Sequence, residues 1–340
     1  MNPRTAAILL LATLMPLGVH ANSDVVVFDN GDRLTGEIKS LARGKLNFKT
    51  DATDTISIEW DNVAFLSSEQ NIQVETHQGR RYLGRLKLSP ALRTISVDMD
   101  GVPLEIAAND VVTLTPIEEK GINRLDGDVT AGYNFSQASE VQQFQFGLDM
   151  QIRTETRIFD LSVDNSLSDS ADNEASQRSA VVLDYKRLRS NRWFTGAMIG
   201  ATRNDELGID MRTSLGAGIG RILSRTNYNS TNIESGLMVS KENLASEESD
   251  QDTLEAYVGL NWDWFRYDSP ELDLSTSLQV IPNLTDWGRV RAELDISVKW
   301  EMIDDLFWQI SLYDSFDSSP AVEDAEKNDY GIVTSIGYSF

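Results

Sequence analysis

The side chains that could carry out chemistry in this sequence are few, and their types exclude several classes of site. The chain has no cysteine, which excludes disulfides, thiolate nucleophiles and cysteine-based zinc sites. Its two histidines are His20 and His77, and residues 122–340 contain none. Because general-base catalysis near neutral pH most often uses histidine, a Ser-His pair is unavailable in that region. His77 has no cysteine or second histidine near it in the sequence, so we expect a surface residue rather than a metal ligand.

Acidic and basic side chains that recur at every second position are the remaining candidates. Asp160 and Asp164 would share one face of a strand, as would Glu293 and Asp295, and such pairs can act as acid and base. On the water-filled inner face of a barrel, carboxylates are more often solvated or paired with arginine than catalytic. We therefore expect no enzyme, no catalytic residue, no cofactor and no metal site. The charged residues expected to line this inner face, the lumen, are Asp149, Arg153, Asp160, Asp164, Arg289, Arg291, Glu293, Asp295 and Lys299.

The region that must position these charges, residues 122–340, alternates apolar and polar residues along about twelve segments. From Val290 to Trp300 every second residue is apolar, and the residues between them are charged or polar. Successive side chains of a strand point to opposite faces, so each segment would have one apolar face and one wet face. A soluble β-sandwich also has one wet face and is the alternative to a membrane barrel.

Three features of this region favour a membrane-spanning barrel over a sandwich. The apolar face carries very few charges, as contact with lipid requires. Short linkers such as 154–157 alternate with longer acidic ones such as 168–177 and 241–252, as periplasmic turns and outer loops do. Aromatic residues gather at both ends of the segments, with Trp300 at one end and Trp287 at the other, as in the two interfacial belts of membrane proteins.

The last segment carries apolar or aromatic residues at alternate positions, among them Tyr338 and Phe340. A terminal phenylalanine on such a strand resembles the signal that the barrel assembly machinery of bacterial outer membranes recognises. We therefore expect Tyr338 and Phe340 to be the assembly signal and that machinery to be a partner. With the preceding features, this predicts an all-β fold containing an antiparallel transmembrane β-barrel of about twelve strands.

The first residues of the chain have the pattern of a targeting segment. Arg4 supplies a positive charge, an apolar run covers residues 6–17, and small residues precede a cleavage site at Ala21. We expect a signal peptide over residues 1–21, with cleavage between Ala21 and Asn22. A membrane anchor is the alternative, but the apolar run is short for a span of about 20 residues.

Residues 22–120 contain an internal repeat. The stretch from Gly31 to Gly36 recurs from Gly79 to Gly84, an offset of 48 residues, and the two copies cover about 24–70 and 72–118. Each copy reads as several short strands around a glycine turn, which resembles a small SH3-like or Sm-like β unit. Sm-like domains often bind RNA, but a net charge of −23 disfavours a phosphate backbone, so we expect no nucleic-acid partner. The repeat is expected to be a periplasmic spacer or docking module ahead of the barrel at 122–340.

Three stretches resemble a known family. They are NGDRLTGEIKSL at 30–41, IEWDNV at 58–63 and the terminal GYSF at 337–340. Together with the order of the parts, they are similar to Gram-negative outer-membrane barrels known as salt-induced outer membrane proteins. The resemblance implies a role in envelope integrity under salt or osmotic stress, and it brings no catalytic residues to this chain.

The expected function is therefore a passive role in the outer membrane of a Gram-negative bacterium. One alternative is a narrow channel that prefers cations, because acidic residues outnumber basic ones on the wet face. Another is a binding or docking protein that acts through the periplasmic repeats. The expected partners are outer-membrane lipid, lipopolysaccharide, the assembly machinery and a periplasmic partner or peptidoglycan.

Overall fold

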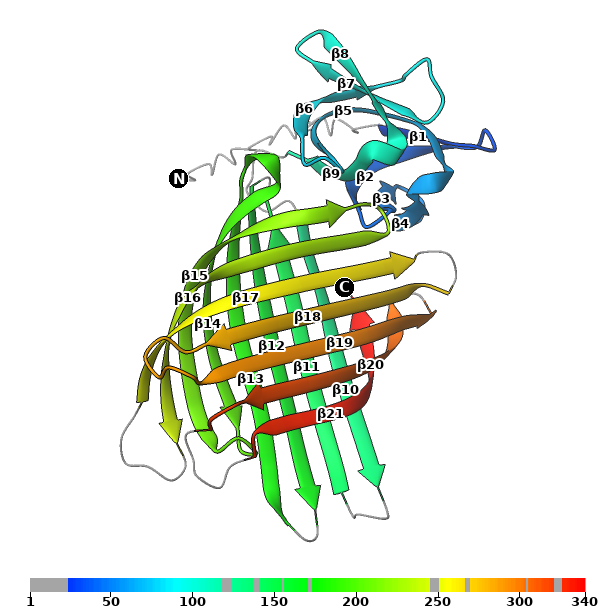
Figure 1. Cartoon of the computed structure of the whole chain (residues 1–340). Helices are drawn as coiled ribbons and strands as arrows, with labels where there is room; N and C mark the ends of the chain where they lie inside the picture. The colour runs from blue at the N-terminus through cyan, green and yellow to red at the C-terminus, as the bar shows by residue number, and fades with distance from the viewer. Residues whose placement is uncertain are drawn as a thin grey trace, which may run out of the picture.

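The computed structural model describes residues 24–117, 124–136, 141–154, 156–170, 173–244, 251–266, 270–303, 305–320 and 326–339, and these residues are almost entirely β-strand. They form one nine-stranded sheet, which we call the N-terminal domain, and one closed barrel. Figure 1 shows that the N-terminal domain lies over one end of the barrel, the end at which the first barrel strand begins. No helix among these residues is long and apolar enough to cross a membrane.

The N-terminal domain has a single continuous sheet in the order β4-β3-β2-β1-β5-β6-β7-β8, with β9 paired to β2 and β5. Its strands are β1 (Asp24–Phe28), β2 (Arg33–Ala42), β3 (Lys45–Thr50), β4 (Asp54–Glu59), β5 (Val63–Thr76), β6 (Arg81–Lys87), β7 (Thr94–Met99), β8 (Val102–Ala107) and β9 (Val111–Pro116). The short 3-10 helices η1 (Trp60–Asn62) and η2 (Ala108–Asp110) follow β4 and β8.

The sequence repeat becomes two halves of this one sheet, because the two copies share β5. The first half of β5 pairs with β1 through Ser67, and the second half pairs with β9 through Val74. The register of β5 against β6 shifts between Ser68 and Ile72, where the strand passes from one copy to the other. Buried residues of both copies form a single core. The indole Nε1 of Trp60 donates to the carbonyl of Ala108, 48 positions later, at 2.8 Å and so joins equivalent sites of the two halves.

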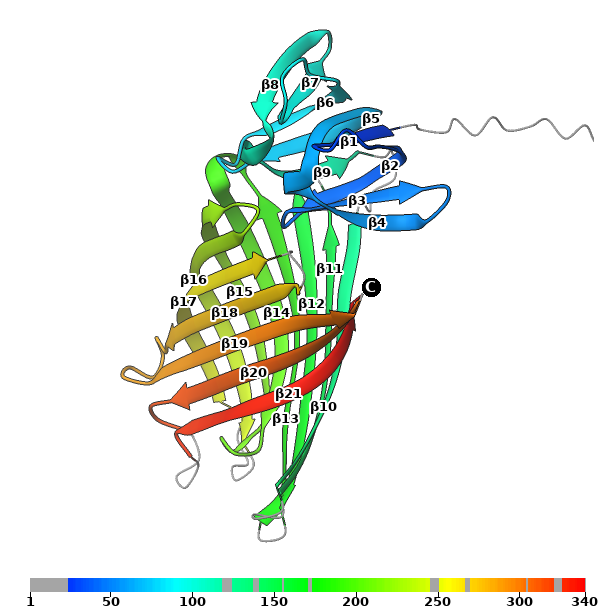
Figure 2. The same ribbon diagram turned by 90° about the vertical axis from the view of Figure 1, so that its right-hand side faces the viewer.

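The barrel closes through twelve strands in sequence order, each antiparallel to its neighbours, and this confirms the predicted barrel. Its strands are β10 (Arg124–Ser136), β11 (Val141–Arg153), β12 (Arg157–Ser170), β13 (Asn173–Leu188), β14 (Trp193–Asn204), β15 (Ile209–Arg225), β16 (Asn229–Leu244), β17 (Gln251–Arg266), β18 (Leu272–Pro282), β19 (Val290–Ile303), β20 (Leu306–Asp317) and β21 (Asn328–Ser339). A 3-10 helix, η3 (Ser190–Arg192), joins β13 to β14. Figure 2 shows the closure, where β21 lies beside β10.

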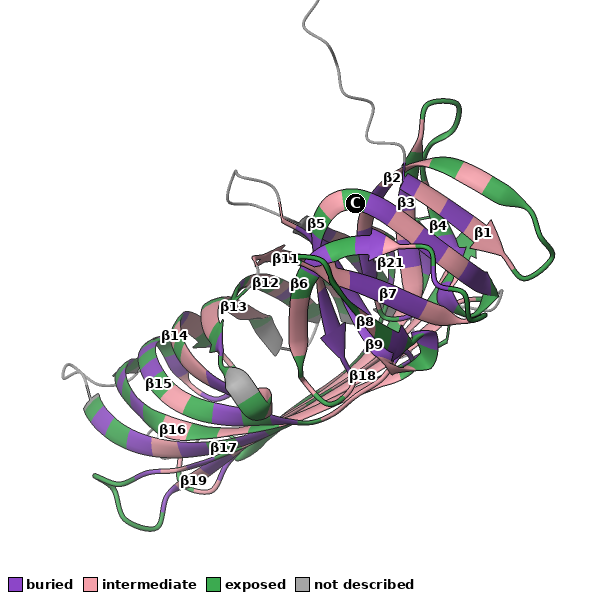
Figure 3. Cartoon of the chain, turned by 90° about the horizontal axis from the view of Figure 1, so that it is seen from above, coloured by how far each residue is buried: buried purple, intermediate pink, exposed green. Residues whose placement is uncertain are grey.

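The barrel strands alternate between an exposed apolar face and a buried polar face. On β15, Leu215 is 57% exposed while Arg212 is 6% exposed. Figure 3 shows exposed and buried positions alternating along β15 and β16. A polar inner face and an apolar outer face are what a barrel in lipid requires.

Glycines on the inner face let aromatic rings pack closely against the wall. A Cβ at Gly236 on β16 would lie 2.7 Å from Cε1 of Tyr257, and one at Gly220 on β15 would overlap the ring of Phe194. Real Cβ atoms do not approach other heavy atoms so closely, so these positions admit only glycine without movement.

One expected loop is a hairpin instead. The linker expected over 168–177 is largely strand, because β12 continues to Ser170 and β13 begins at Asn173. Ser168 pairs with Ser176 and continues the ladder. This part of the hairpin carries small polar side chains on both faces, so it has no apolar face. The alternation in the sequence therefore does not indicate a strand there.

Candidate functional site

The inner face of the barrel is identified by side chains that meet across strands that are not neighbours. Lys299 on β19 donates from Nζ to Oδ1 of Asp128 on β10 at 2.9 Å. The guanidinium carbon of Arg178 on β13 lies 4.0 Å from the ring centre of Tyr313 on β20. Because β13 and β20 lie far apart around the barrel, this contact crosses the lumen. The lumen is therefore bridged rather than freely open along its length.

At the end of the barrel away from the N-terminal domain, a buried ion network lines the side formed by β15 to β20. Nη2 of Arg289 contacts Oδ2 of Asp317 at 2.6 Å and Oε2 of Glu242 at 3.2 Å. Nε of Arg212 donates to Oε1 of the same glutamate at 2.8 Å. Glu242 is 0% exposed, so its charge is compensated by the two arginines and not by water.

A second buried pair extends this network along the wall. Nη2 of Arg291 donates to Oε2 of Glu255 at 2.7 Å, and Nε donates to Oε1 at 3.1 Å. The hydroxyl of Ser240 donates to the same carboxylate at 2.9 Å. Such a two-pronged guanidinium–carboxylate pair fixes geometry as well as charge, so this side of the lumen is rigid.

The other candidate wall charges lie where carboxylates are in excess. Asp149 and Asp164 both accept from the hydroxyl of Ser162, at 2.8 and 3.2 Å. Asp160 accepts from Gln151 at 2.7 Å and lies 3.7 Å from the ammonium of a lysine on β13. Asp295 pairs along the ladder with Tyr313 and shares its face. These carboxylates give the lumen an acidic wall.

Glu293 and Arg153 occupy the two ends of the wall. Oε1 of Glu293 lies 3.7 Å from Nη1 of Arg291, next to the buried network. Arg153 lies at the opposite end, where its Nη2 donates to Oε2 of Glu75 on β5 at 3.2 Å. This arginine therefore contacts the N-terminal domain as well as the barrel.

Glu75 is the centre of a clamp between the N-terminal domain and the barrel. Its carboxylate also lies 3.3 Å from Nη1 of Arg225 on β15 and 3.8 Å from Nε of Arg81 in its own domain. Burial alone would raise the pKa of Glu75, but Arg225, Arg153 and Arg81 outweigh it and hold the pKa below its usual range. The carboxylate therefore stays charged and holds three arginines around it.

Further contacts fasten the first copy of the repeat to the same end of the barrel. Lys45 contacts Glu271, which precedes β18, and Nη2 of Arg43 lies 3.2 Å from Oδ1 of Asp273. The hydroxyl of Tyr228 in the β15–β16 turn donates to Asp61. Burial, together with a hydrogen bond to the neighbouring Glu301, raises the pKa of Glu271 to about 7. Contacts from both copies thus fasten the N-terminal domain to this end of the barrel.

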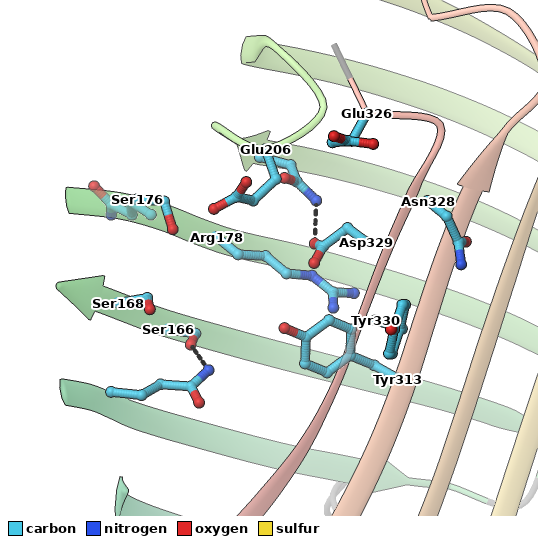
Figure 4. Close-up of a pocket in the computed structure, with 13 residues that line it drawn as sticks. Ser166, Ser168, Ser176, Arg178, Glu206, Tyr313, Glu326, Asn328, Asp329 and Tyr330 are labelled. Carbon is cyan, nitrogen blue, oxygen red and sulfur yellow. Dashed lines mark hydrogen bonds between the residues drawn. The ribbon is translucent and has the colours of Figure 1, made fainter. Parts of the chain in front are cut away.

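The opposite mouth contains a cavity of about 290 Å³ between the ends of β11 to β14 and those of β20 and β21. Figure 4 shows Arg178 reaching over the ring of Tyr313 inside it. Nδ2 of Asn204 donates to Oδ2 of Asp329 on the opposite wall at 2.8 Å. No group of three or more metal-ligating side chains lies among the residues that the structure describes.

Sequence reasoning missed the clamp and the cavity. Arg178 is an even number of positions from Asp184 and Lys186, so the alternation of the strand already places its side chain on the inner face. Nothing local in the sequence relates Glu75 to Arg153 or Arg225, which are 78 and 150 residues away. The clamp therefore became visible only in three dimensions.

The targeting and assembly residues fall partly outside the described chain. Tyr338 points outward from β21 and pairs with Val129 of β10 at the closure of the barrel. Phe340 and the cleavage residues Ala21 and Asn22 lie outside the described residues.

Comparisons with known proteins complete these observations. The family described as "Protein of unknown function, DUF481" matches residues 129–340. Among solved structures, the NanC porin is 11% identical with a TM-score of 0.41, covering 63% of this chain and 98% of that one. An outer membrane channel from Pseudomonas putida F1 is 10% identical with a TM-score of 0.38, covering 64% and 95%. CdiB from Acinetobacter baumannii is 10% identical with a TM-score of 0.36, covering 94% and 79%. No curated protein matches the chain.

Proposed function

The chain belongs to the DUF481 family, and from that premise we propose that it is an outer-membrane barrel that conducts small cations through a narrow, acid-lined lumen. The N-terminal domain stands on the periplasmic side and restricts that mouth. The expected signal peptide and the two aromatic belts support this location and orientation.

The observation that carries the proposal is the acidic surplus on the inner face. Asp149, Asp164 and Asp295 form no ion pair among the residues that the structure describes, whereas the arginines of the buried network are all paired. A narrow lumen with low-dielectric walls concentrates the field of such carboxylates. Cations are therefore attracted into the lumen and anions are repelled.

The bridges across the lumen support a small conductance rather than a wide pore. Lys299 reaches Asp128, and Arg178 reaches Tyr313, each across strands that are not neighbours. The clamp around Glu75 holds the N-terminal domain at the periplasmic mouth. Each of these contacts narrows the path, so solutes larger than a hydrated ion or a small polar molecule are excluded.

A passive role in envelope integrity under salt or osmotic stress is the second candidate. The ion network around Glu242 and Arg289 favours it, because a dry and rigid wall braces a barrel whether or not the barrel conducts. A protein with this role alone would conduct no ions and would pass no small solutes.

Recording single-channel currents of the full chain in planar bilayers separates the two candidates. We expect small, discrete conductance steps in KCl, reduced when Asp149→Asn and Asp164→Asn are combined. Asp286→Asn, in the exposed turn between β18 and β19, is the matched control that removes one carboxylate outside the lumen and leaves the current unchanged. A silent bilayer, with insertion verified independently, would leave only the envelope role.

A further inference from the structure

Every side chain that lines the cavity at the outer mouth has a group able to form hydrogen bonds. All 13 lining residues end in a hydroxyl, amide, carboxylate or guanidinium group. Ligand sites for apolar molecules are lined mostly by aliphatic and aromatic carbon. This cavity has no aliphatic lining residue, so its chemistry selects a ligand that is itself dense in hydrogen-bonding groups.

Several of the lining side chains are held in place by contacts with one another. The amide of Gln143 donates to the hydroxyl of Ser166 at 3.0 Å, and Asn204 donates to Asp329 at 2.8 Å. Ser166 and Asn204 are themselves buried. Figure 4 shows Ser166 and Asp329 on opposite walls of the barrel. Fixed donors and acceptors lower the cost of ordering the site on binding.

The charge of the lining decides between classes of polar ligand. Three carboxylates, those of Glu206, Glu326 and Asp329, face one guanidinium, that of Arg178. The guanidinium is already stacked on Tyr313. The cavity therefore has a negative surplus, which repels acidic ligands and favours neutral or ammonium-bearing ones.

The size of the cavity limits the ligand further. A volume of about 290 Å³ is at the lower end of the range for small-molecule sites. It accommodates one or two sugar-sized rings.

From this lining, charge and volume we infer that the cavity binds small polyhydroxylated solutes that are neutral or carry an ammonium group, such as a hexose or an amino sugar. The inference rests on the proposed function in one respect, because the cavity would be the outer entrance of the same conduit. Bound solute would sit between the walls that Arg178 and Asn204 join, directly over the lumen.

Binding to the full chain in detergent, measured by calorimetry, tests the inference without any current being recorded. The probes are glucosamine at slightly acidic pH, glucose and glucuronate, three sugars of nearly one shape that differ in charge. We expect glucosamine to bind about tenfold more tightly than glucuronate, with glucose between them. Binding in the opposite order, or no binding of any of the three, would overturn the inference. Such a result would leave the proposed conductance standing, because that function is measured by current alone.

Two variants link the binding to this cavity. Glu206→Gln removes a carboxylate that is exposed in the turn following β14. We expect it to weaken glucosamine binding severalfold and to leave glucose binding unchanged. Asp286→Asn, at the same end of the barrel but outside the cavity, should change neither. Equal losses in both variants would show that only the general charge of the rim matters, and the assigned site would be wrong.

Discussion

Replacing Glu75 by glutamine is expected to loosen the N-terminal domain from the barrel. The carboxylate is almost fully buried and lies 3.2 Å from Arg153 and 3.3 Å from Arg225. Glutamine keeps the size of the side chain and removes its charge. The three arginines then lose the carboxylate that they share, so the docked state loses stability while the barrel keeps its own hydrogen bonds.

The size of the effect follows from how dry the clamp is. Removing one partner of a fully buried ion pair costs about 3–5 kcal/mol. The side chains of Arg153, Arg225 and Arg81 keep 15%, 20% and 19% of their exposure, so water can solvate them in part. We therefore expect a loss of about 2–3 kcal/mol, which corresponds to a rise of about 30- to 150-fold in the open fraction.

A cysteine placed in the interface reports this opening directly, because the chain has no cysteine of its own. Asn227 in the β15–β16 turn is 6% exposed, and its amide donates to the carbonyl of Val111 in the N-terminal domain at 3.1 Å. In an Asn227→Cys background, Glu75→Gln should raise the rate of thiol labelling by the factor above. The Ala52→Cys variant, with its thiol exposed on the β3–β4 turn, is the control and should label at an unchanged rate.

The pH dependence provides a second check on the same clamp. Because the pKa of Glu75 is held below its usual 4.5 in the docked state, the clamp's stabilisation is complete above pH 4.5 and is lost as the pH falls through the docked-state pKa. Glu75→Gln should abolish this acid loss. If the thiol at position 227 is labelled at the same rate with and without Glu75→Gln, at neutral as well as at acidic pH, the clamp is refuted.

The remaining predictions concern other contacts of the two domains. The pKa of Glu271 is raised from 4.5 to about 7, so its contribution to folding stability is complete below pH 4.5 and is lost as the pH rises through about 7; the unfolding temperature should fall over that window, and Glu271→Gln should flatten the fall. Gly236→Ala drives a Cβ into the backbone carbonyl of Ala217 and should cost about 1–3 kcal/mol, seen as a lower temperature for the loss of compact gel mobility. Gly196→Ala, whose nearest neighbour lies at 3.5 Å, should have little effect, and equal losses would contradict the packing argument. Arg291→Met leaves the buried carboxylate of Glu255 unpaired and should cost about 3–5 kcal/mol in the same assay, with partial recovery when Glu255→Gln is added; a stable single variant would show that the pair is dispensable.

The barrel could be predicted because its signal is local. Period-two alternation assigns each side chain to a face, and it placed Leu215 outward and Arg212 inward, as the structure has them. Repetition over many segments then made a closed sheet the consistent solution. The β12–β13 hairpin was misread as a loop because Ser168 and Ser176 carry no apolar alternation.

The arrangement of the repeats and the contacts between domains were not open to the same reasoning. The offset between Gly31 and Gly79 reveals duplication, but it does not say that β5 joins both copies into one sheet with one core. The clamp depends on side chains that meet only after the barrel has closed and the N-terminal domain has docked. The same holds for Arg178 and Tyr313, which come from opposite walls and line the cavity at the end of the barrel away from the N-terminal domain.

The reversal potential of the full chain in a planar bilayer, measured across a KCl gradient, tests the central claim most directly. An acidic inner wall predicts a potential whose sign and size approach those of a membrane permeable to potassium alone. A potential near zero, or one with the sign of chloride permeation, would contradict the assignment of Asp149, Asp164 and Asp295 to the wall that a passing ion meets.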